Sequence, residues 1–426
     1  MSREHAASWK WWVCGTLLLA TMINYMDRQA LTQTATELKR SYNLGDARYG
    51  RVEAFFSYAF GLGAIVFGTL ADRFSPRRVY PIALFGWSLA GLLTPLLRYP
   101  ELTTPLESLD EPGSGPYLWL LGCRTMLGFF EAGHWPCALM TARQILSAKD
   151  RPLGNGIIQS GATIGTVVVI GYVTLLRHLE LGWPIVFWTV GCAGLLWLPL
   201  WFALIREGDL TGTPPAAADD SAASRTDLGS RVRMFFTLAL VVSSIAISWQ
   251  FLRAWMPKYL VESLGYSEDF RDGAIIAYSL FADVGSMLSG VIVFWLVSKG
   301  FGIHASRVLG FTIFCGITAL AALVPVVEER SLKVVLLIVA GAGILGLHPF
   351  YYSLVQELPT RSMGKLSGLL TCCAWTATAL VQASQGRYIE ATKSYDLGLQ
   401  LVAFSPLAGL AAMLLLWRPG KRSTSG

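Results

Sequence analysis

The chain has 426 residues, of which 53% are hydrophobic and 15% charged, and its mean hydropathy is +0.49. These values exclude an ordinary soluble globular protein, in which about 25% of the residues are charged. The net charge of +6 is modest for this length and does not imply binding to nucleic acid.

Apolar runs of about 18–25 residues recur along the whole chain, and each is long enough to cross a bilayer as a helix. The runs lack the alternation of barrel strands, so we predict an all-α membrane protein with twelve transmembrane helices. No signal-peptide cleavage pattern flanks the first run, which is therefore expected to stay as a membrane anchor. The runs begin near Trp11, Tyr49, Val79, Tyr117, Leu153, Pro184, Arg233, Gly273, Arg307, Val334, Leu366 and Leu397.

The predicted first helix carries Asp27 and Arg28 side by side. Adjacent side chains point about 100° apart on a helix, so the two cannot face one partner. We expect one of them to face a central cavity and the other a neighbouring helix. A role at the helix end is the alternative, but the helical pattern continues past both residues to Ala35.

The loop after the second helix is rich in charge and small residues. Gly68 permits close helix packing, Asp72 can pair across the short loop, and Arg73, Arg77 and Arg78 are expected to hold it in the cytoplasm. The stretch resembles the signature loop of the major facilitator superfamily, Gly-x-x-x-Asp-Arg-x-Gly-x-Arg-Arg, with Ser75 where the second glycine is usual. We assign the loop a gating role by this resemblance.

The fourth helix contains Arg124 and Glu131, seven residues apart and so on one helix face. A charge at the bilayer centre costs roughly 2.5–3.5 kcal/mol on insertion scales. Two opposite charges on one face therefore indicate a pair that faces a polar interior. A purely structural ion pair between helices is the alternative interpretation.

The fifth helix combines small residues with one amide. Gly154, Gly161 and Gly165 predict tight contact with another helix. Gln159 is expected to be buried and to need a hydrogen-bond partner. The residues alone do not decide whether that partner is another helix or a ligand hydroxyl.

Residues 206–232 break the apolar pattern with Ala, Asp, Ser, Thr and Pro. We interpret them as a flexible cytoplasmic linker between two six-helix bundles, residues 1–205 and 233–426. Lys and Arg are more frequent on the side of the predicted membrane that carries both termini, which places the termini in the cytoplasm.

Two charged residues lie within the predicted seventh and eighth helices. Arg253 stands among aromatic residues and either stacks on them or presents a second positive charge to the cavity. Asp283 is a candidate partner for Arg253, and such a pair would make both residues structural.

The two halves show a faint internal repeat, because His134-Trp-Pro136 is echoed by His348-Pro349. Repeated halves with a substrate site near the midplane are a known plan of membrane transporters. Both histidines could carry protons, but a histidine beside a proline in a helix is more often a local hydrogen-bonding residue. The seven cysteines show no metal-binding or disulfide spacing, and we expect no metal and no cofactor.

Within the superfamily, the chain resembles the anion:cation symporter family, which includes bacterial hexuronate and galactonate transporters. The matching motifs are Asn24-Tyr25-Met26-Asp27-Arg28, Arg124…Leu127-Gly128…Glu131-Ala132…Pro136, Gln159-Ser160-Gly161, Trp255-Met256-Pro257-Lys258-Tyr259 and Ala282-Asp283-Val284-Gly285-Ser286.

The resemblance implies roles for several residues. Asp27 and Glu131 would be protonatable, Arg124 would hold the substrate carboxylate, and Arg28 would serve the salt-bridge network. Tyr25, Gln159 and Trp375 would line the substrate site.

The second helix departs from the sugar-acid members, because Phe60 and Ala64 stand where those members carry polar groups. Together with the positive charge of Arg253, this favours an anion that is less hydroxylated, or more charged, than a simple uronate.

We therefore expect a proton-coupled symporter of an organic anion, in which protonation of Glu131 frees Arg124 for substrate and the halves then rock about the site. An exchanger or facilitator, a transport-fold sensor without flux, and sodium coupling stay open.

A drug:proton antiporter fits less well because two cationic side chains suit anions. A membrane enzyme fits less well because the sequence shows no nucleophile–base or metal constellation. We expect a monomer in the plasma membrane.

Overall fold

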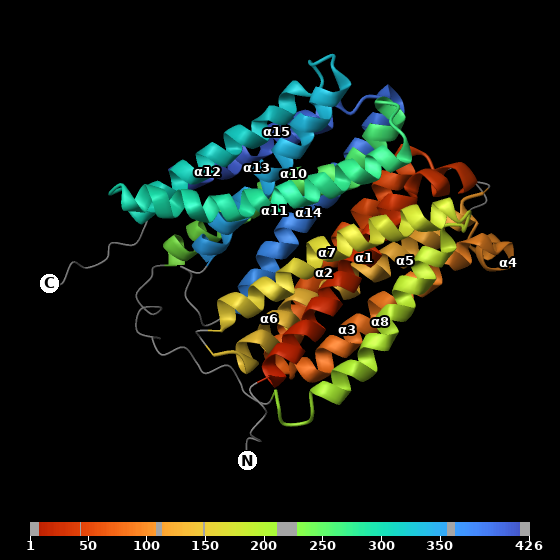
Figure 1. Cartoon of the computed structure of the whole chain (residues 1–426), viewed down its shortest axis with the longest axis horizontal. Helices are drawn as coiled ribbons and strands as arrows, with labels where there is room; N and C mark the ends of the chain where they lie inside the picture. Colours follow the sequence, from red (N-terminus) through yellow and green to blue (C-terminus); the bar gives the residue numbers. More distant parts are fainter. Residues whose placement is uncertain are drawn as a thin grey trace. The chain divides into compact units, whose positions relative to one another are not determined.

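The computed structural model describes residues 8–42, 44–107, 113–147, 150–210, 228–355 and 363–417, which are mainly helical and contain no β-strand. Short 3₁₀ turns at Thr94–Arg98, Thr104–Leu106 and Leu320–Leu323 and a π-helical turn at Tyr259–Ser263 extend or join the helices. The helices (Figure 1) are α1 (Trp9–Tyr42), α2 (Asp46–Arg73), α3 (Pro76–Leu93), α4 (Pro100–Thr103), α5 (Gly115–Glu131), α6 (His134–Ile145), α7 (Arg151–His178), α8 (Pro184–Leu204), α10 (Leu228–Lys258), α11 (Glu268–Ser298), α12 (Ile303–Ala319), α13 (Arg330–Val355), α14 (Met363–Thr392) and α15 (Asp396–Leu415).

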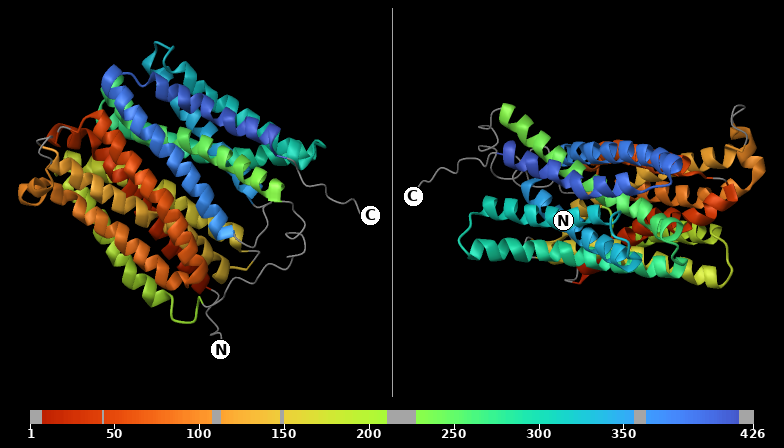
Figure 2. Two further views of the ribbon diagram at one scale, coloured as in Figure 1. Left: turned by 180° about the vertical axis from the view of Figure 1, so that it is seen from behind. Right: turned by 90° about the horizontal axis from the view of Figure 1, so that it is seen from above.

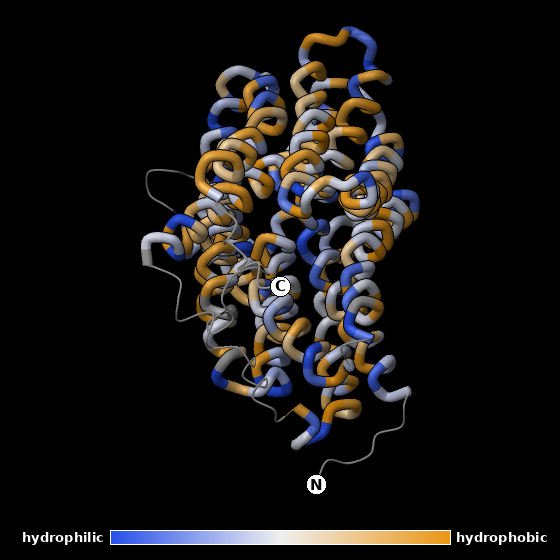
Figure 3. Tube along the Cα trace, turned by 90° about the vertical axis from the view of Figure 1, so that its left-hand side faces the viewer, coloured by the Kyte–Doolittle hydropathy of each residue, from blue (hydrophilic) through white to orange (hydrophobic). Residues whose placement is uncertain are grey.

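Ten helices of the described chain are long and apolar enough to cross a membrane. The remaining two of the twelve predicted spans correspond to α1, which has 34 residues, and to α5 with α6, which have 17 and 12. Hydrophobic residues run along the helices, and hydrophilic ones gather near the helix ends and at a few points within (Figure 3). Large apolar side chains such as Leu196 and Phe294 are exposed, as expected of helices surrounded by lipid.

The chain forms two compact units. The first holds Met1–Ala218, Arg253–Ile276 and Arg361–Ser394, and the second holds Asp219–Leu252, Ala277–Thr360 and Tyr395–Gly426. The predicted division into bundles 1–205 and 233–426 stays a prediction, and most of the predicted linker lies outside the described residues.

Glycines set the helix contacts of the first unit. A Cβ at Gly161 would lie 2.6 Å from the Leu18 carbonyl oxygen, and one at Gly165 would lie 2.4 Å from that of Met22. These contacts bring α7 against α1 and confirm the predicted tight packing at both glycines. In the same unit α14 runs along α2 (Figure 2), and Gly50 faces Gly386 across that interface.

In the second unit, α12 packs on α13 and α15. Gly310 and Gly346 leave room for the rings of Phe350 and Phe314. The Ser248 hydroxyl on α10 donates a hydrogen bond to the Val402 carbonyl on α15 at 2.9 Å.

The signature loop is fixed to the end of α8. Ser75 is the N-cap of α3 and accepts a hydrogen bond from the Arg77 amide at 3.3 Å. Its hydroxyl donates to the Leu210 carbonyl at 2.8 Å, and Arg77 Nε donates to the Ile205 carbonyl at 3.0 Å. The serine that replaces the usual glycine is therefore both a helix cap and a link to the segment that follows α8. The Asp72 side chain lies outside the described residues, so its pairing stays a prediction.

We predict that Gly50→Ala destabilises the protein by about 1–3 kcal/mol, because the new methyl group forces overpacking. Its Cβ would lie 2.6 Å from the Gln382 carbonyl oxygen and 2.8 Å from Gly386 Cα, both of which are backbone atoms. Gly122→Ala is the matched control, because nothing lies within 4 Å of a Cβ there. Thermal unfolding in detergent measures both, and equal melting temperatures for the two variants would contradict the predicted α2–α14 contact.

Candidate functional site

Six of the buried charged side chains of the first unit form the candidate site, and we call them the buried ionic cluster. They come from α1, α2, α5 and the end of α10, and each is at most 7% exposed. Burying ions away from water costs several kcal/mol each unless they are paired. The members are Asp27, Arg28, Glu53, Arg124, Glu131 and Arg253.

Arg28 is the partner of Glu131. Its Nε and Nη2 donate hydrogen bonds to Glu131 Oε2 at 3.0 and 2.6 Å. The prediction that Glu131 pairs with Arg124 is therefore wrong, because its partner is Arg28. Although Arg124 and Glu131 share a helix, the carboxylate turns toward α1, where Arg28 can donate two hydrogen bonds to it.

An aromatic box encloses the Arg28 guanidinium. Its Cζ lies 5.2 Å from the ring centroids of Tyr25 and Phe60 and 5.5 Å from those of Phe56 and Trp375. Phe60 also stacks on Trp375 with 4.2 Å between centroids. Phe60, which lacks the polar group that the sugar-acid members carry at this position, thus contacts Arg28 by a cation–π interaction.

Arg124 has Glu53 as its nearest carboxylate, with 3.5 Å between Nη2 and Glu53 Oε1. Neither Nε, Nη1 nor Nη2 of Arg124 has a hydrogen-bond partner among the described residues. Its other close contact is with the Phe56 ring, 4.8 Å from Cζ to the centroid. The guanidinium is therefore fully buried, and its N–H donors are available to an acceptor from a ligand.

Close helix contact explains why Glu53 and Arg124 meet. A Cβ at Gly128 would lie 2.3 Å from the Phe56 carbonyl oxygen, so α2 and α5 approach closely at this level. Glu53 precedes Phe56 by three residues and Arg124 precedes Gly128 by four. Each charged residue therefore lies about one helical turn before the point of close contact. Glu53 was not among the predicted site residues, although an acid inside an apolar run was the signal for it.

Arg253 also pairs with Glu53, and its Nη2 bonds Glu53 Oε2. Its Nη1 lies 3.4 Å from the Thr32 hydroxyl. The Tyr49 hydroxyl donates to the neighbouring Ala254 carbonyl at 3.1 Å, which fixes this end of α10 on α2. Asp283 is half-buried on α11, and its predicted pairing with Arg253 stays a prediction.

Asp27 is 1% exposed, and neither carboxyl oxygen has a hydrogen-bond partner among the described residues. It points toward α3, where a Cβ at Gly91 would lie 2.9 Å from Asp27 Oδ1. The adjacent residues Asp27 and Arg28 thus face different surroundings, as their 100° separation predicted.

The other predicted site residues are placed as follows. Trp375 and Tyr25 are half-buried beside Arg28, as described above. Gln159 is exposed, so its expected burial is wrong. It lies two residues, or about 200°, from Gly161, and packing of Gly161 on α1 turns the amide away from that interface.

His134 is a local hydrogen-bonding residue, as predicted. It is fully buried at the start of α6, with the Thr21 hydroxyl 3.1 Å from Nε2 and the Tyr80 hydroxyl 2.7 Å from Nδ1. His348 Nδ1 lies 3.3 Å from the Ile344 carbonyl oxygen. The predicted fourth helix is broken between Glu131 and His134, which separates α5 from α6.

A second set of ion pairs joins the helix ends on the side of the α1–α2 connection, and we call them the rim pairs. Lys258 bonds Asp46, and both side chains are buried. Lys39 lies 3.1 Å from Glu262, and Arg177 Nη2 lies 2.9 Å from Asp272. These contacts tie α1, α2 and α7 to the end of α10 and the start of α11.

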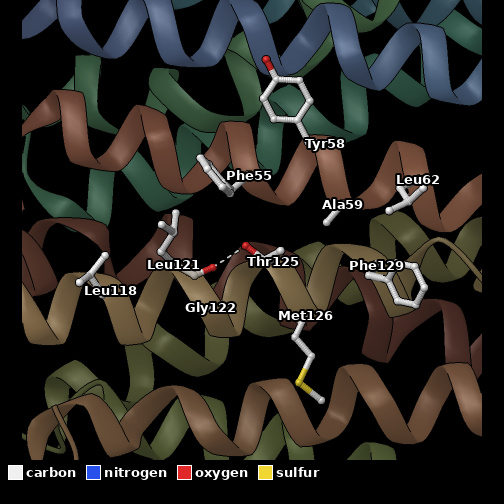
Figure 4. A pocket seen from close by; sticks show the side chains of 10 residues that line it. All are labelled: Phe55, Tyr58, Ala59, Leu62, Leu118, Leu121, Gly122, Thr125, Met126 and Phe129. Carbon is white, nitrogen blue, oxygen red and sulfur yellow. Dashed lines mark hydrogen bonds between the residues drawn. The ribbon is translucent and has the colours of Figure 1, made fainter. Parts of the chain in front are cut away.

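A pocket of about 720 Å³ lies between α2 and α5, away from the charges (Figure 4). Its lining is apolar apart from Tyr58 and Thr125, and the Thr125 hydroxyl already donates to the Leu121 carbonyl at 2.7 Å. A hydrophilic anion has no charged partner there, so the buried ionic cluster is the better candidate site.

A sequence family described as Major Facilitator Superfamily matches residues 17–382. The chain belongs to this superfamily. A probable L-galactonate transporter of Escherichia coli (strain K12) is 24% identical, with 94% of this chain and 88% of that protein covered. A probable galactarate/D-glucarate transporter, GudP of Bacillus subtilis (strain 168), is 24% identical with 97% and 93% covered.

Solved structures agree on the major facilitator fold. A D-xylose-proton symporter superposes with a TM-score of 0.72 at 15% identity, with 96% of this chain and 97% of that chain covered. A bacterial homologue of the lysosomal transporter Spinster gives a TM-score of 0.67 at 18% identity, with 97% and 95% covered. These relatives and structural neighbours are transporters and not enzymes. The chain is accordingly a multi-pass membrane transporter of this superfamily.

We predict that Asp46→Asn costs about 3–5 kcal/mol of stability, because removal of one partner leaves Lys258 buried with Glu262 only at 3.9 Å. Glu207→Gln is the matched control. It breaks the exposed Arg78–Glu207 pair, which spans 3.2 Å and is worth about 0–1 kcal/mol. Thermal unfolding measures the stability of both variants. Similar losses of stability would show that burial does not increase the cost of breaking the Asp46–Lys258 pair.

Proposed function

We propose that the chain is a secondary active transporter that carries an organic anion, a sugar acid or related carboxylate, together with protons by alternating access. Arg124 carries this proposal. It is a fully buried guanidinium whose nitrogens have no hydrogen-bond acceptor among the described residues, and guanidiniums form strong paired hydrogen bonds with carboxylates. We assign Arg124 to the carboxylate of the substrate.

Asp27 and Glu131 are the proposed proton carriers. Asp27 is a buried carboxyl with no partner among the described residues, so a proton there needs no ion pair to be broken. Glu131 is bound to Arg28, and its protonation would release that arginine. This revises the expected mechanism, because the arginine that Glu131 controls is Arg28 and not Arg124.

The names of the relatives support the substrate class. Two of them are named for galactonate and for galactarate and D-glucarate, which are sugar acids. We propose that Tyr25 and Trp375 line the site beside Arg28, and that Arg253 acts on the substrate through its charge. Gln159 is exposed, and we propose that it faces the transport path.

We further propose that the protein works as a monomer in the plasma membrane with both termini in the cytoplasm. The excess of Lys and Arg on that side supports the orientation. In this orientation the rim pairs lie at the outer end of the helices, and the signature loop of Gly68, Asp72, Arg73, Arg77 and Arg78 lies at the inner end, where it would take part in gating.

Uniport or exchange of an anion is the second candidate function. The voltage-gated purine nucleotide uniporter SLC17A9 of Mus musculus is also 24% identical, with 97% of this chain and 90% of that protein covered. A uniporter needs the arginines but no proton carrier. The response of uptake to a pH gradient therefore separates the two functions.

We predict that a sugar acid such as galactonate raises the melting temperature of the detergent-purified protein, and that neutral galactose does not. A ligand at 100 times its dissociation constant adds about 2.7 kcal/mol to stability. Arg124→Ala should abolish the shift, whereas Arg330→Ala, at an exposed arginine at the start of α13, should retain it. Stabilisation by galactose, or an unchanged shift in Arg124→Ala, would remove the basis for an anion site.

We predict that Asp27→Asn and Glu131→Gln each lower proton-driven uptake in proteoliposomes by at least tenfold, because each removes a titratable carboxyl. Exchange of labelled for unlabelled substrate without a gradient should survive at least one of these changes, since exchange needs no net proton movement. Uptake driven by a sodium gradient instead of a pH gradient tests which ion is coupled to transport. Wild-type uptake in both variants would favour the uniporter.

A further inference from the structure

Glu53 is the charged residue of the cluster to which the proposed mechanism gives no role. It is fully buried on α2 and lies between two arginines from different helices, Arg124 on α5 and Arg253 at the end of α10. The Arg28 charge on α1 also acts on it. One carboxylate is thus shared by two guanidiniums, each of which is capable of holding a carboxylate of its own.

The two contacts of Glu53 are unequal. Its Oε2 accepts a hydrogen bond from Arg253. Its Oε1 lies 3.5 Å from Arg124 Nη2 and has no hydrogen-bond partner among the described residues. At this separation the contact with Arg124 is electrostatic and not a hydrogen bond of ordinary geometry. Arg124 therefore keeps its donors for a second carboxylate while Glu53 stays with Arg253.

The charges of these residues define what the site accepts. Arg28 and Glu131 cancel, and Glu53 cancels one of the charges of Arg124 and Arg253, so the three together carry one positive charge. With a proton on Asp27 and with Glu131 ionised on Arg28, as in this structure, the buried ionic cluster matches an anion with a single negative charge. From the sequence, the positive charge of Arg253 favoured a more highly charged anion. In the structure, the negative charge of Glu53 offsets that positive charge.

We propose that Glu53 is a specificity-determining residue that limits the site to one substrate carboxylate, which binds Arg124 while Glu53 retains Arg253. This inference rests on the proposed anion transport and goes beyond it by assigning the charge of the substrate. Neutralisation of Glu53 exposes a second guanidinium to the ligand. The site of the variant then suits a dicarboxylate.

The test compares two sugar acids with the same carbon skeleton, galactonate with one carboxylate and galactarate with two. Dissociation constants are measured by calorimetry on the purified full-length protein. The wild type should bind galactonate more tightly. Glu53→Gln should shift the ratio of the two constants at least tenfold toward galactarate, because the negative charge that lies between Arg124 and Arg253 is then removed.

Two further variants separate charge from structure. Glu53→Gln combined with Arg253→Gln restores the charge of the site and should restore the wild-type ratio, even if Glu53→Gln alone proves too unstable to purify. Glu53→Asp keeps the charge and should leave the ratio within twofold of the wild type. Glu207→Gln removes an exposed carboxylate and is the control for a general charge effect.

The outcomes are distinct. A ratio that stays within twofold in Glu53→Gln, while both acids still bind, overturns this inference and leaves the proposed function intact. The same holds if Glu53→Gln lowers only the melting temperature, since a purely structural clamp would not change the selectivity. If the wild type binds neither acid, the proposed anion transport fails and this inference fails with it.

Discussion

The burial of charge is the constraint on which the first unit depends. Each guanidinium removed from water needs a nearby counter-charge, because the penalty for an unpaired buried ion exceeds what packing alone offsets. The helices α1, α2, α5 and the end of α10 therefore have to meet at one level, where Glu131 reaches Arg28 and Glu53 lies between Arg124 and Arg253. The same constraint makes the cluster sensitive to any anion that enters it.

Small residues and aromatic rings make this meeting possible. Gly128 lets α5 approach the α2 backbone at Phe56, and Gly91 leaves room for the Asp27 carboxyl against α3. Phe56 contacts both Arg28 and Arg124, so one ring supports two cations from different helices. The ring of Phe60 likewise contacts Arg28, so the position that lacks the polar group of the sugar-acid members still stabilises a positive charge.

Several parts of this arrangement could be predicted from the sequence. The apolar runs and the signature loop indicated the fold, and the charges at Asp27, Arg28, Arg124 and Glu131 marked the helices that build the site. The partners could not be predicted, because a helix face fixes the direction of a side chain only within its own helix. Glu53 was missed for a related reason, since it lies near the start of an apolar run, where an acid is compatible with a helix end.

The sequence by itself determined that this protein spans a membrane, belongs to a transporter fold and buries ionisable residues in its helices, because length, hydropathy and local spacing are properties of single segments. Only the tertiary structure decided that Glu131 pairs with Arg28, that Glu53 joins Arg124 to Arg253, and that Gln159 is exposed. The physical reason is that electrostatic pairing in a low-dielectric interior depends on distances between helices, which glycine contacts set to within a few ångströms.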